Sequence, residues 1–588
     1  MQNILDSLLR ITEWTQSVMW GPWMITLLVL TGVMYTVITR GVQVRRLIEA
    51  LRLTFSPADR KAAADQPGDI SPFAALMTAL AATVGNGNLA GVATAIATGG
   101  PGAPFWMWVT GFIGMATKYG EGFLGVRFRR ILPNGSAAGG PMYYCRDGIR
   151  FLSIAKILGA TFAFCGGLTA LIGTGNMAQS NSMALAFKDQ FGIPFWASAL
   201  ILVVLTGMVI IGGIKRIGPV AEKLVPAMII FYLLGAGIIL IARFSLIPDA
   251  FLLIFRSAFS ARAAGGALIG TSIQQAIRMG VARGVLSNES GLGSAAIAQA
   301  ASKSNDPTRN GLIAMTGTFI DTIVVNTLTT LSIVLTGFWA FTDASQGAMD
   351  LRAISPEETA VYALPGPGGL ILAQLAEDSH LVQRGLRKGD VLYALEGQPI
   401  QDEGDLRTRL LALPTHQTFE LTVYRDGTAF SLTGKSFRTA TADLPIMPRM
   451  TSTALTANAF SSVIPYGGFI IALSSFLFGY STLLGWSYYG ERCWEYIFGL
   501  KVILPYRYIF LVLLASGALI QGAHLNIVWY LGDSFNALMA VPNLLGMWFL
   551  SGYVGRFTTA YFRDRHGTLA ALSRGTDPFL KRKGAGGK

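Results

Sequence analysis

The chain has 588 residues, of which 52% are hydrophobic and only 13% are charged. Soluble globular proteins carry about twice that charged fraction. This composition excludes a string of soluble domains and indicates that lipid surrounds most of the chain. The net charge of +13 does not indicate a nucleic-acid binder, because the basic residues gather in particular loops. We therefore expect an all-α polytopic membrane protein.

Apolar runs long enough to span a bilayer recur along the sequence. One further stretch, near 484–500, is interrupted by Glu491, Arg492 and Glu495, which favours an interfacial helix there. The other runs predict eleven transmembrane helices. These lie at about residues 21–39, 73–97, 103–126, 157–183, 194–213, 219–242, 267–302, 310–338, 453–483, 503–521 and 533–556.

Lysine and arginine are distributed unevenly between alternate loops. One set of loops holds 28 basic residues, whereas the opposite set of short loops holds 5. Because basic loops stay in the cytoplasm, this asymmetry predicts an outside N-terminus and a basic cytoplasmic tail over 557–588. Binding of another molecule by the tail run 581–583 is a weaker alternative. The basic set comprises residues 40–61, 127–156, 214–223, 303–309, 491–507 and the segment from 556.

A soluble-like insert lies between the eighth and ninth runs, at 339–452. It carries 14 acidic and 10 basic residues, and the loop count places it outside the cytoplasm. The Asp426-Gly427 pair predicts a hairpin turn, and 406–413 predicts a short amphipathic helix. Strands are expected at 369–374, 390–395, 418–424 and 429–432.

Three segments of the insert carry a resemblance: GGLILAQLAEDSHLVQRGLRKGDVLYALEGQPI, DLRTRLLA and TFELTVYRDG. Through them the insert resembles a PDZ domain of the bacterial periplasmic type, an α+β fold, over about 366–436. The resemblance implies that a C-terminal peptide, or a protein bearing one, adds a strand beside Gly366–Leu372. An empty groove in a domain that only braces the outer surface is an equal alternative.

The second apolar run contains the sequence ATVGNGNLAG at 82–91, near the middle of the membrane. Glycine and asparagine form poor helix, and lipid tolerates broken backbone only where it faces protein, water or a ligand. A break there offers carbonyls to a cation and free N–H groups to a carboxylate. Close packing through small residues is the alternative, but Asn86 and Asn88 favour a binding site.

A second interruption, LSNESGLGS at 286–294, lies five runs after the first. Paired interrupted helices in corresponding positions of two halves are typical of inverted-repeat transporters. We therefore expect a first repeat over 73–242 and a second over 243–338 and 453–556. Residues 1–72 would then hold an extra helix and a cytoplasmic loop.

Four longer motifs carry a family resemblance: GNGNLAGVATAIATGGPGAPFWMWVTGFIGMATKYGE (85–121), GNMAQSNS (175–182), GVARGVLSNESGLGSA (280–295) and FGYSTLLGWSYYGER (478–492). Through these motifs the chain is similar to the alanine or glycine:cation symporter family. The resemblance implies sodium coupling and a LeuT-type 5+5 inverted repeat, with the two breaks in the first and sixth core helices. Departures from the family pattern are Asn86 in place of a small hydroxyl residue, Ser290 in place of alanine, and the insert.

A zwitterionic amino acid needs partners for its carboxylate and its ammonium away from water. The backbone amides of Asn86 and Gly87 and the side-chain amide of Asn88 are expected to meet the carboxylate. Gln179 resembles a family pocket residue, although an interhelical hydrogen bond would explain it equally well. The remaining expected substrate-binding residues are Thr83 at the first break, Leu286, Ser287 and Asn288 beside the ammonium, and Trp486 as a wall that limits side-chain size.

Na⁺ is the expected coupling ion, because hydroxyl and carbonyl oxygens suit it and cannot shuttle protons near neutral pH. By resemblance to the LeuT-type site, the Ser481 and Thr482 hydroxyls act together with three backbone carbonyls. Ordinary helix hydrogen bonding is the alternative for these two hydroxyls. A second cation near the Thr83 carbonyl and Asn88 has no further support. The three carbonyls belong to Ala81, Val84 and Phe478.

Other ionisable residues lie within the apolar runs. Lys118 and Glu121 are spaced i, i+3, which predicts mutual pairing. Glu289 is near both Arg283 and the expected ammonium position, and its partner stays open. Asp321 is a functional candidate because lone carboxylates in spans are costly, although the sequence assigns it no role.

These features predict a symporter that imports a small neutral amino acid, alanine or glycine first, across a bacterial inner membrane by alternating access. The insert and the N-terminus would then be periplasmic. A membrane protease is disfavoured because the chain has four histidines and no HExxH motif, so we expect no enzyme. An amino-acid-sensing receptor that uses the insert as an interaction module is the alternative.

Overall fold

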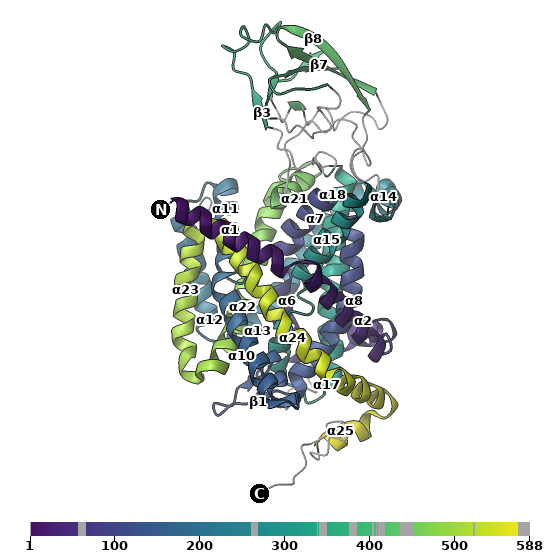
Figure 1. Ribbon diagram of the computed structural model, residues 1–588, viewed down its shortest axis with the longest axis vertical. Helices are drawn as coiled ribbons and strands as arrows, with labels where there is room; N and C mark the ends of the chain where they lie inside the picture. Colours follow the sequence, from purple (N-terminus) through teal and green to yellow (C-terminus); the bar gives the residue numbers. More distant parts are fainter. Residues whose placement is uncertain are drawn as a thin grey trace.

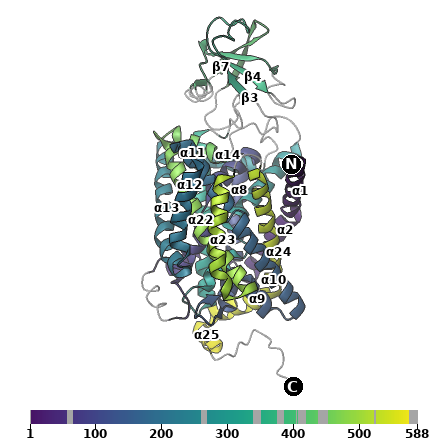
Figure 2. The same cartoon turned by 90° about the vertical axis from the view of Figure 1, so that its left-hand side faces the viewer.

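The computed structural model describes residues 2–56, 66–259, 269–337, 339, 350–374, 385–402, 405–406, 409, 418–435, 452–520 and 524–573. Helices form a bundle whose long members run along one axis (Figures 1 and 2). A small β-sheet domain lies beyond one end of this bundle, at the end where the N-terminus also lies. The C-terminal helix lies at the opposite end.

In the part of the chain that the structure describes, the bundle consists of helices and two short strands. The elements are α1 (Gln2–Met19), α2 (Pro22–Ile38), α3 (Val42–Arg45), α4 (Leu47–Phe55), α6 (Pro72–Thr83), η1 (Gly87–Gly91), α7 (Val92–Gly99), α8 (Ala103–Arg127), β1 (Arg130–Ile131), β2 (Ala137–Ala138), α9 (Pro141–Gly148), α10 (Leu152–Ile172), α11 (Met177–Phe191), α12 (Phe195–Ile210), α13 (Ile214–Ala242), η2 (Phe244–Leu246), α14 (Ile247–Phe259), α15 (Ile269–Asn288), α16 (Ser294–Ala300), α17 (Pro307–Thr318), η3 (Phe319–Asn326), α18 (Thr327–Thr336), α21 (Ser452–Ser461), α22 (Gly467–Phe498), η5 (Leu500–Val502), α23 (Ile503–Leu519), α24 (His524–Arg563) and α25 (Arg565–Ser573).

Helices occupy all eleven predicted apolar runs. Among the described residues, seven helices are long and apolar enough to cross a membrane, or eight if the bent pair α6 and α7 counts as one span. Three predicted spans fall outside that group. These are α8, which contains Lys118 and Glu121, the 16-residue α12, and α15 with α16. A polytopic membrane protein is therefore established, and the number eleven stays a prediction.

The two interrupted helices pack against each other in opposite directions. The first half of one, α6, contacts α16, which is the second half of the other. The remaining halves, α7 and α15, also contact each other, and η1 lies against α15. An antiparallel pair of broken helices is the arrangement that an inverted repeat requires.

The predicted interfacial helix near 484–500 is wrong, because α22 continues through this stretch to Phe498. Its charged residues are buried and paired within the protein instead of marking a membrane surface. Arg492 lies 3.1 Å from a Glu491 carboxylate oxygen and also pairs with Glu495. Arg507 of α23 donates to Glu491 at 2.7 Å. The ninth run is divided at Tyr466, whose positive φ of 59° separates α21 from α22.

The sheet domain confirms the strands predicted within the insert. Its strands are β3 (Asp350–Ala353), β4 (Leu370–Gln374), β5 (Val391–Leu395), β6 (Gln398–Pro399), β7 (Thr418–Arg425) and β8 (Thr428–Lys435). The order is β3-β4-β5-β7-β8, with β6 paired to β5. Asp426 and Gly427 form the predicted two-residue turn with φ values of 48° and 77°. Most of the predicted helix at 406–413 lies outside the described residues.

The predicted position of an added peptide strand, beside Gly366–Leu372, is wrong. Strand β4 is already paired on both sides, with β3 through Leu351 and Leu372 and with β5 through Leu370 and Leu392. No edge of β4 is therefore left for an incoming peptide. Strand β3 lies before the predicted start of the domain at 366, which explains why the sequence did not show this pairing.

Within the sheet domain, Asp390 is 1% exposed and accepts two hydrogen bonds of 2.7 Å from Arg425. We predict that Arg425→Gln destabilises the domain by about 2 kcal/mol, because it leaves a buried carboxylate without its charged partner. Hydrogen exchange of the β7 amides in the full-length protein measures this loss.

A matched control is Arg352→Gln, which removes an exposed pair with Glu358. Exposed pairs contribute little to stability, so exchange should change much less. The Arg352 guanidinium lowers the pKa of Glu358 to about 2, and this substitution should raise that pKa toward its usual range. Equal exchange in both variants would show that the Asp390 pair does not hold the domain together.

Candidate functional site

The first predicted break is present. Helix α6 ends at Thr83, Val84 adopts an extended backbone, and the chain resumes as the π-helix η1, with a 52° bend between the two halves. The Gly85 N–H donates to Asn88 Oδ1 at 2.8 Å. A Cβ on Gly85 would lie 2.7 Å from Thr482 Oγ1, so close packing against α22 requires glycine there.

The second predicted break is also present, between α15 and α16. Glu289, Gly291 and Gly293 have positive φ values of 53°, 96° and 84°. A Cβ on Gly291 would lie 2.5 Å from Leu28 Cδ2 of α2. Glycine is therefore needed both for the backbone conformation and for space, whereas Glu289 adopts a conformation that costs energy.

The two breaks meet in the middle of the bundle. A Cβ on Gly87 would lie 3.7 Å from the Ser287 Cα, which is ordinary contact distance. The Asn88 Nδ2 donates to Ser287 Oγ at 3.1 Å. The structure thus brings together the residues predicted on either side of a bound amino acid.

A buried polar cluster surrounds Asn88 at this junction. Its side-chain nitrogen lies 2.7 Å from Asp321 Oδ1 and 2.9 Å from Asn326 Oδ1. Ser287 and Thr322 donate to the other Asp321 oxygen at 3.0 Å and 2.8 Å. Asp321 and Asn326 both lie on η3, a π-helix of the kind often found at functional sites. The sequence indicated Asp321 as a candidate but gave no signal for Asn326.

Asn86 lies beside Gln179, as the predicted pocket requires. Its amide donates to Gln179 Oε1 at 3.0 Å, and its oxygen accepts a hydrogen bond of 2.7 Å from Ser475. The interhelical bond considered for Gln179 therefore exists and joins it to another predicted site residue. Ser475 was missed, because a serine in an apolar helix gives no signal of its own. Thr83 is buried at the end of α6, 3.5 Å from the Leu80 carbonyl.

The backbone donors of the second break are bound by a carboxylate from α8. Glu121 Oε1 accepts from the Gly291 and Gly293 N–H groups at 3.0 Å and 2.9 Å, and from Asn543 at 2.9 Å. Lys118 lies 3.8 Å from the other Glu121 oxygen, which confirms the predicted pair. Glu121 thus occupies the donors that an anionic ligand would otherwise use at the second break.

The partner of Glu289, which the sequence left open, is Trp486. The indole Nε1 donates to Glu289 Oε1 at 3.1 Å, Ser294 donates to the other oxygen, and the Glu289 carbonyl accepts from Lys118 at 3.0 Å. In the described residues the Glu289 side chain forms no ion pair with Arg283. Asn288 donates to Thr322 at 3.0 Å.

Most of the predicted sodium ligands also converge. Ser481 Oγ lies 3.2 Å from the Ala81 carbonyl oxygen and 2.9 Å from that of Phe478. Thr482 Oγ1 lies 2.9 Å from the same Phe478 oxygen. Val84 lies in the break directly after α6. The contacts with Phe478 are ordinary helix bonds, but the contact with Ala81 joins α22 to the first broken helix.

The comparisons with known proteins cover nearly all of the chain. The profile of the Sodium:alanine symporter family matches residues 5–361 and 428–572, and a PDZ domain profile matches 347–434. The chain is 39% identical to the sodium/alanine symporter AgcS of Methanococcus maripaludis, over 93% of this chain and 95% of that protein. It is 29% identical to the probable sodium/glutamine symporter GlnT of Bacillus subtilis, over 96% and 92% of the two chains.

Among solved structures, a mutant manganese transporter of Eremococcus coleocola covers 88% of this chain and 80% of its own, at 12% identity and a TM-score of 0.37. That score is too low to support a conclusion about the fold. The family profile, in contrast, matches more than half of the chain, and the Methanococcus relative matches almost throughout. Both resemblances inferred from the sequence are confirmed: the chain belongs to the sodium:alanine symporter family and carries a PDZ domain.

Proposed function

We propose that this protein imports a small neutral amino acid, alanine or glycine first, together with Na⁺ across a bacterial inner membrane. The observation that carries the proposal is the meeting of two broken helices at Gly87 and Ser287. Such a junction offers backbone donors and acceptors to a dipolar solute at membrane depth. Membership of the sodium:alanine symporter family and the similarity to the sodium/alanine symporter AgcS support the same activity.

The proposed orientation of the substrate follows from which backbone groups are already occupied. Glu121 accepts from the Gly291 and Gly293 amides of the second break. The substrate carboxylate therefore binds at the first break, at the amides of Asn86 and Gly87. The Asn88 side chain, expected from the sequence to help, already donates to Asp321 and accepts from Gly85, so it positions this segment instead. The ammonium then faces the carbonyls and side chains of the second break, at Leu286, Ser287 and Asn288. Thr83, Gln179 and Trp486 complete the pocket.

The proposed sodium site lies between α6 and α22. Its oxygens come from the Ala81, Val84 and Phe478 carbonyls and from the hydroxyls of Ser481 and Thr482. The 3.2 Å contact between Ser481 and Ala81 supports it, because a cation there would join the broken helix to α22. Na⁺ binding would thereby favour one arrangement of the first broken helix, which is the requirement for coupled transport.

The architecture we propose is a LeuT-type 5+5 inverted repeat with eleven spans and one extra N-terminal helix. The antiparallel packing of α6 with α16 and of α7 with α15 supports the inversion. The N-terminus and the sheet domain lie at one end of the bundle, whereas α25 and β1 lie at the other (Figure 1). This agrees with a periplasmic N-terminus and PDZ domain and a cytoplasmic C-terminus.

Purified protein in proteoliposomes is expected to accumulate labelled alanine when an inward sodium gradient is imposed. Replacing Na⁺ by K⁺, or imposing only a proton gradient, should abolish accumulation, because the proposed ligands cannot carry protons. Competition by unlabelled glycine, serine and glutamine ranks the substrates. Binding of alanine without accumulation would instead favour a receptor, and deleting 345–445 shows whether transport needs the insert.

Removing a proposed sodium ligand should weaken the dependence on sodium more than the affinity for alanine. Ser481→Ala and Thr482→Val are each expected to raise the half-saturating sodium concentration about tenfold, a loss of about 1.4 kcal/mol. The matched control is Ser487→Ala, a buried serine of the same helix whose hydroxyl, within the described part of the chain, bonds only to the Leu484 carbonyl of that helix, at 2.8 Å. A sodium dependence that is equal in all three variants would refute the site.

Asp321→Asn tests the polar cluster at the junction. Asn88, Ser287 and Thr322 all donate to the carboxylate, so an amide NH₂ would face a donor and leave it unpaired. We expect alanine uptake to fall at least about tenfold, as for loss of a buried charged acceptor. Asp249→Asn, at an exposed carboxylate on α14, is the control and should transport normally. Normal uptake by Asp321→Asn would exclude the cluster from transport.

A further inference from the structure

Glu289 is a buried carboxylate that the proposed binding scheme does not use. It is 5% exposed and lies at the start of the second break with a φ of 53°. Both ends of the residue are fixed, because its carbonyl accepts from Lys118 and its carboxylate accepts from Ser294 and Trp486. Three partners thus hold Glu289 in a backbone conformation that costs free energy, and such strained residues cluster at functional sites.

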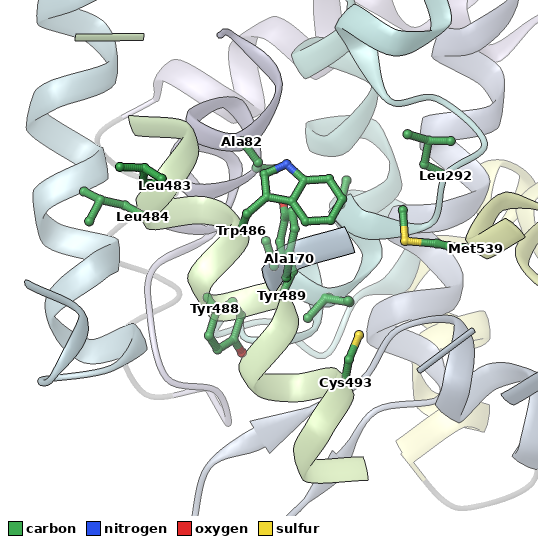
Figure 3. Close-up of a cluster of buried hydrophobic side chains, with 14 of the residues drawn as sticks. Ala82, Ala170, Leu292, Leu483, Leu484, Trp486, Tyr488, Tyr489, Cys493 and Met539 are labelled. Carbon is green, nitrogen blue, oxygen red and sulfur yellow. The ribbon is translucent and has the colours of Figure 1, made fainter. Parts of the chain in front are cut away.

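Trp486 is the partner that leads toward the pocket. The side chain is 2% exposed, and a Cβ on Gly175 would lie 2.8 Å from its ring, so the turn before α11 packs directly on the indole. The Tyr489 ring lies edge-on at 5.6 Å. Figure 3 shows the indole in the buried apolar cluster that also contains Ala82 of α6 and Leu292 of the second break. Trp486 thus lies where both broken helices and the segment leading to Gln179 come together.

We propose that Glu289 is a positioning residue that sets the size limit of the substrate pocket by holding the Trp486 indole in one orientation. The inference rests on the proposed function and adds a determinant of side-chain selectivity to it. The ligands are neutral α-amino acids. The Trp486 indole, held by its hydrogen bond to Glu289, leaves room for short substrate side chains and excludes long or branched ones.

The hydrogen bond between indole and carboxylate is the physical basis of this limit. The indole N–H is buried, and a buried donor that loses its hydrogen bond pays the full cost of desolvation. Packing by Gly175 and Tyr489 confines the ring on other sides, so the bond selects one of the remaining orientations. The Glu289 backbone belongs to the second break, where the ammonium is proposed to bind. The carboxylate of Glu289 therefore holds the Trp486 indole at a fixed position relative to the ammonium.

The test compares the selectivity of sodium-driven uptake in Glu289→Ala, Glu289→Gln and Trp486→Phe proteins. Competition of labelled alanine by unlabelled leucine and glutamine gives the ratio of their inhibition constants to that of alanine. We expect Glu289→Ala and Trp486→Phe each to lower this ratio about tenfold, a change of about 1.4 kcal/mol in discrimination. Glu289→Gln keeps an oxygen for the indole and a donor for Ser294, and should retain most of the selectivity.

A double variant decides whether the two residues act through one bond. Glu289→Ala with Trp486→Phe should be no less selective than either single variant, because the same interaction is removed once. Ser294→Ala is the control that removes the other carboxylate contact and should leave selectivity unchanged. Additive losses in the double variant, or unchanged selectivity in Glu289→Ala, would overturn the proposal.

Two outcomes separate this inference from the proposed function. Lack of sodium-driven alanine uptake in the wild-type protein refutes the function itself, whereas normal uptake with unaltered selectivity refutes only the role of Glu289. If Glu289→Ala does not fold, ultraviolet resonance Raman difference spectra still test the hydrogen bond between Glu289 and Trp486 on which the proposal depends. The indole N–H band of Trp486, assigned with Trp486→Phe, should shift in Glu289→Gln, and no shift would contradict the bond.

Discussion

The structure depends on one constraint: backbone N–H and carbonyl groups that leave a helix inside a membrane must find partners within the protein or in a ligand. Two helices are interrupted where they contact each other, and the protein provides partners for their free backbone groups unequally. At the second break, Glu121 binds the Gly291 and Gly293 N–H groups and Lys118 binds the Glu289 carbonyl. The N–H groups of Gly291 and Gly293 are thereby occupied, so the first break carries the groups that we assign to the substrate carboxylate.

The charged groups differ between the two breaks in the same way as the backbone partners do. Lys118 lies near the carboxylate of Glu121 and the backbone of Glu289, while Asp321 accepts hydrogen bonds from neutral Asn88, Ser287 and Thr322. Burying carboxylates costs free energy unless positive charge or good donors accompany them. In the proposed scheme the substrate ammonium binds at Ser287, which donates to Asp321, so this carboxylate would offset the cost of burying the positive charge.

The sequence predicts what local chemistry determines and misses what only the tertiary fold brings together. The breaks could be predicted because glycines and asparagines near 86 and 290 disfavour a continuous helix regardless of their surroundings. The partners of the breaks could not, since Glu121, Ser475 and Asn543 come from distant helices. The charges at 491–495 were misleading for the same reason: they suggest a membrane surface until Arg507 of another helix is seen to pair with them. In the insert, the strands followed from composition, but the free edges of the sheet depended on β3, whose pairing no local pattern shows.

The insertion point of the PDZ domain follows from the same junction. The domain leaves the bundle after α18 and returns through α21, and both helices pack against α7. Thr456 of α21 donates to the Leu89 carbonyl of η1 at 3.1 Å, so the returning helix supplies a partner for a carbonyl just beyond the first break. A ligand that displaces the insert would therefore also displace α21, which contacts the first broken helix directly. The insert can be removed without loss of the proposed site only if α21 stays in place. The Thr456 hydroxyl of α21 donates to the Leu89 carbonyl, and lipid offers that carbonyl no other donor.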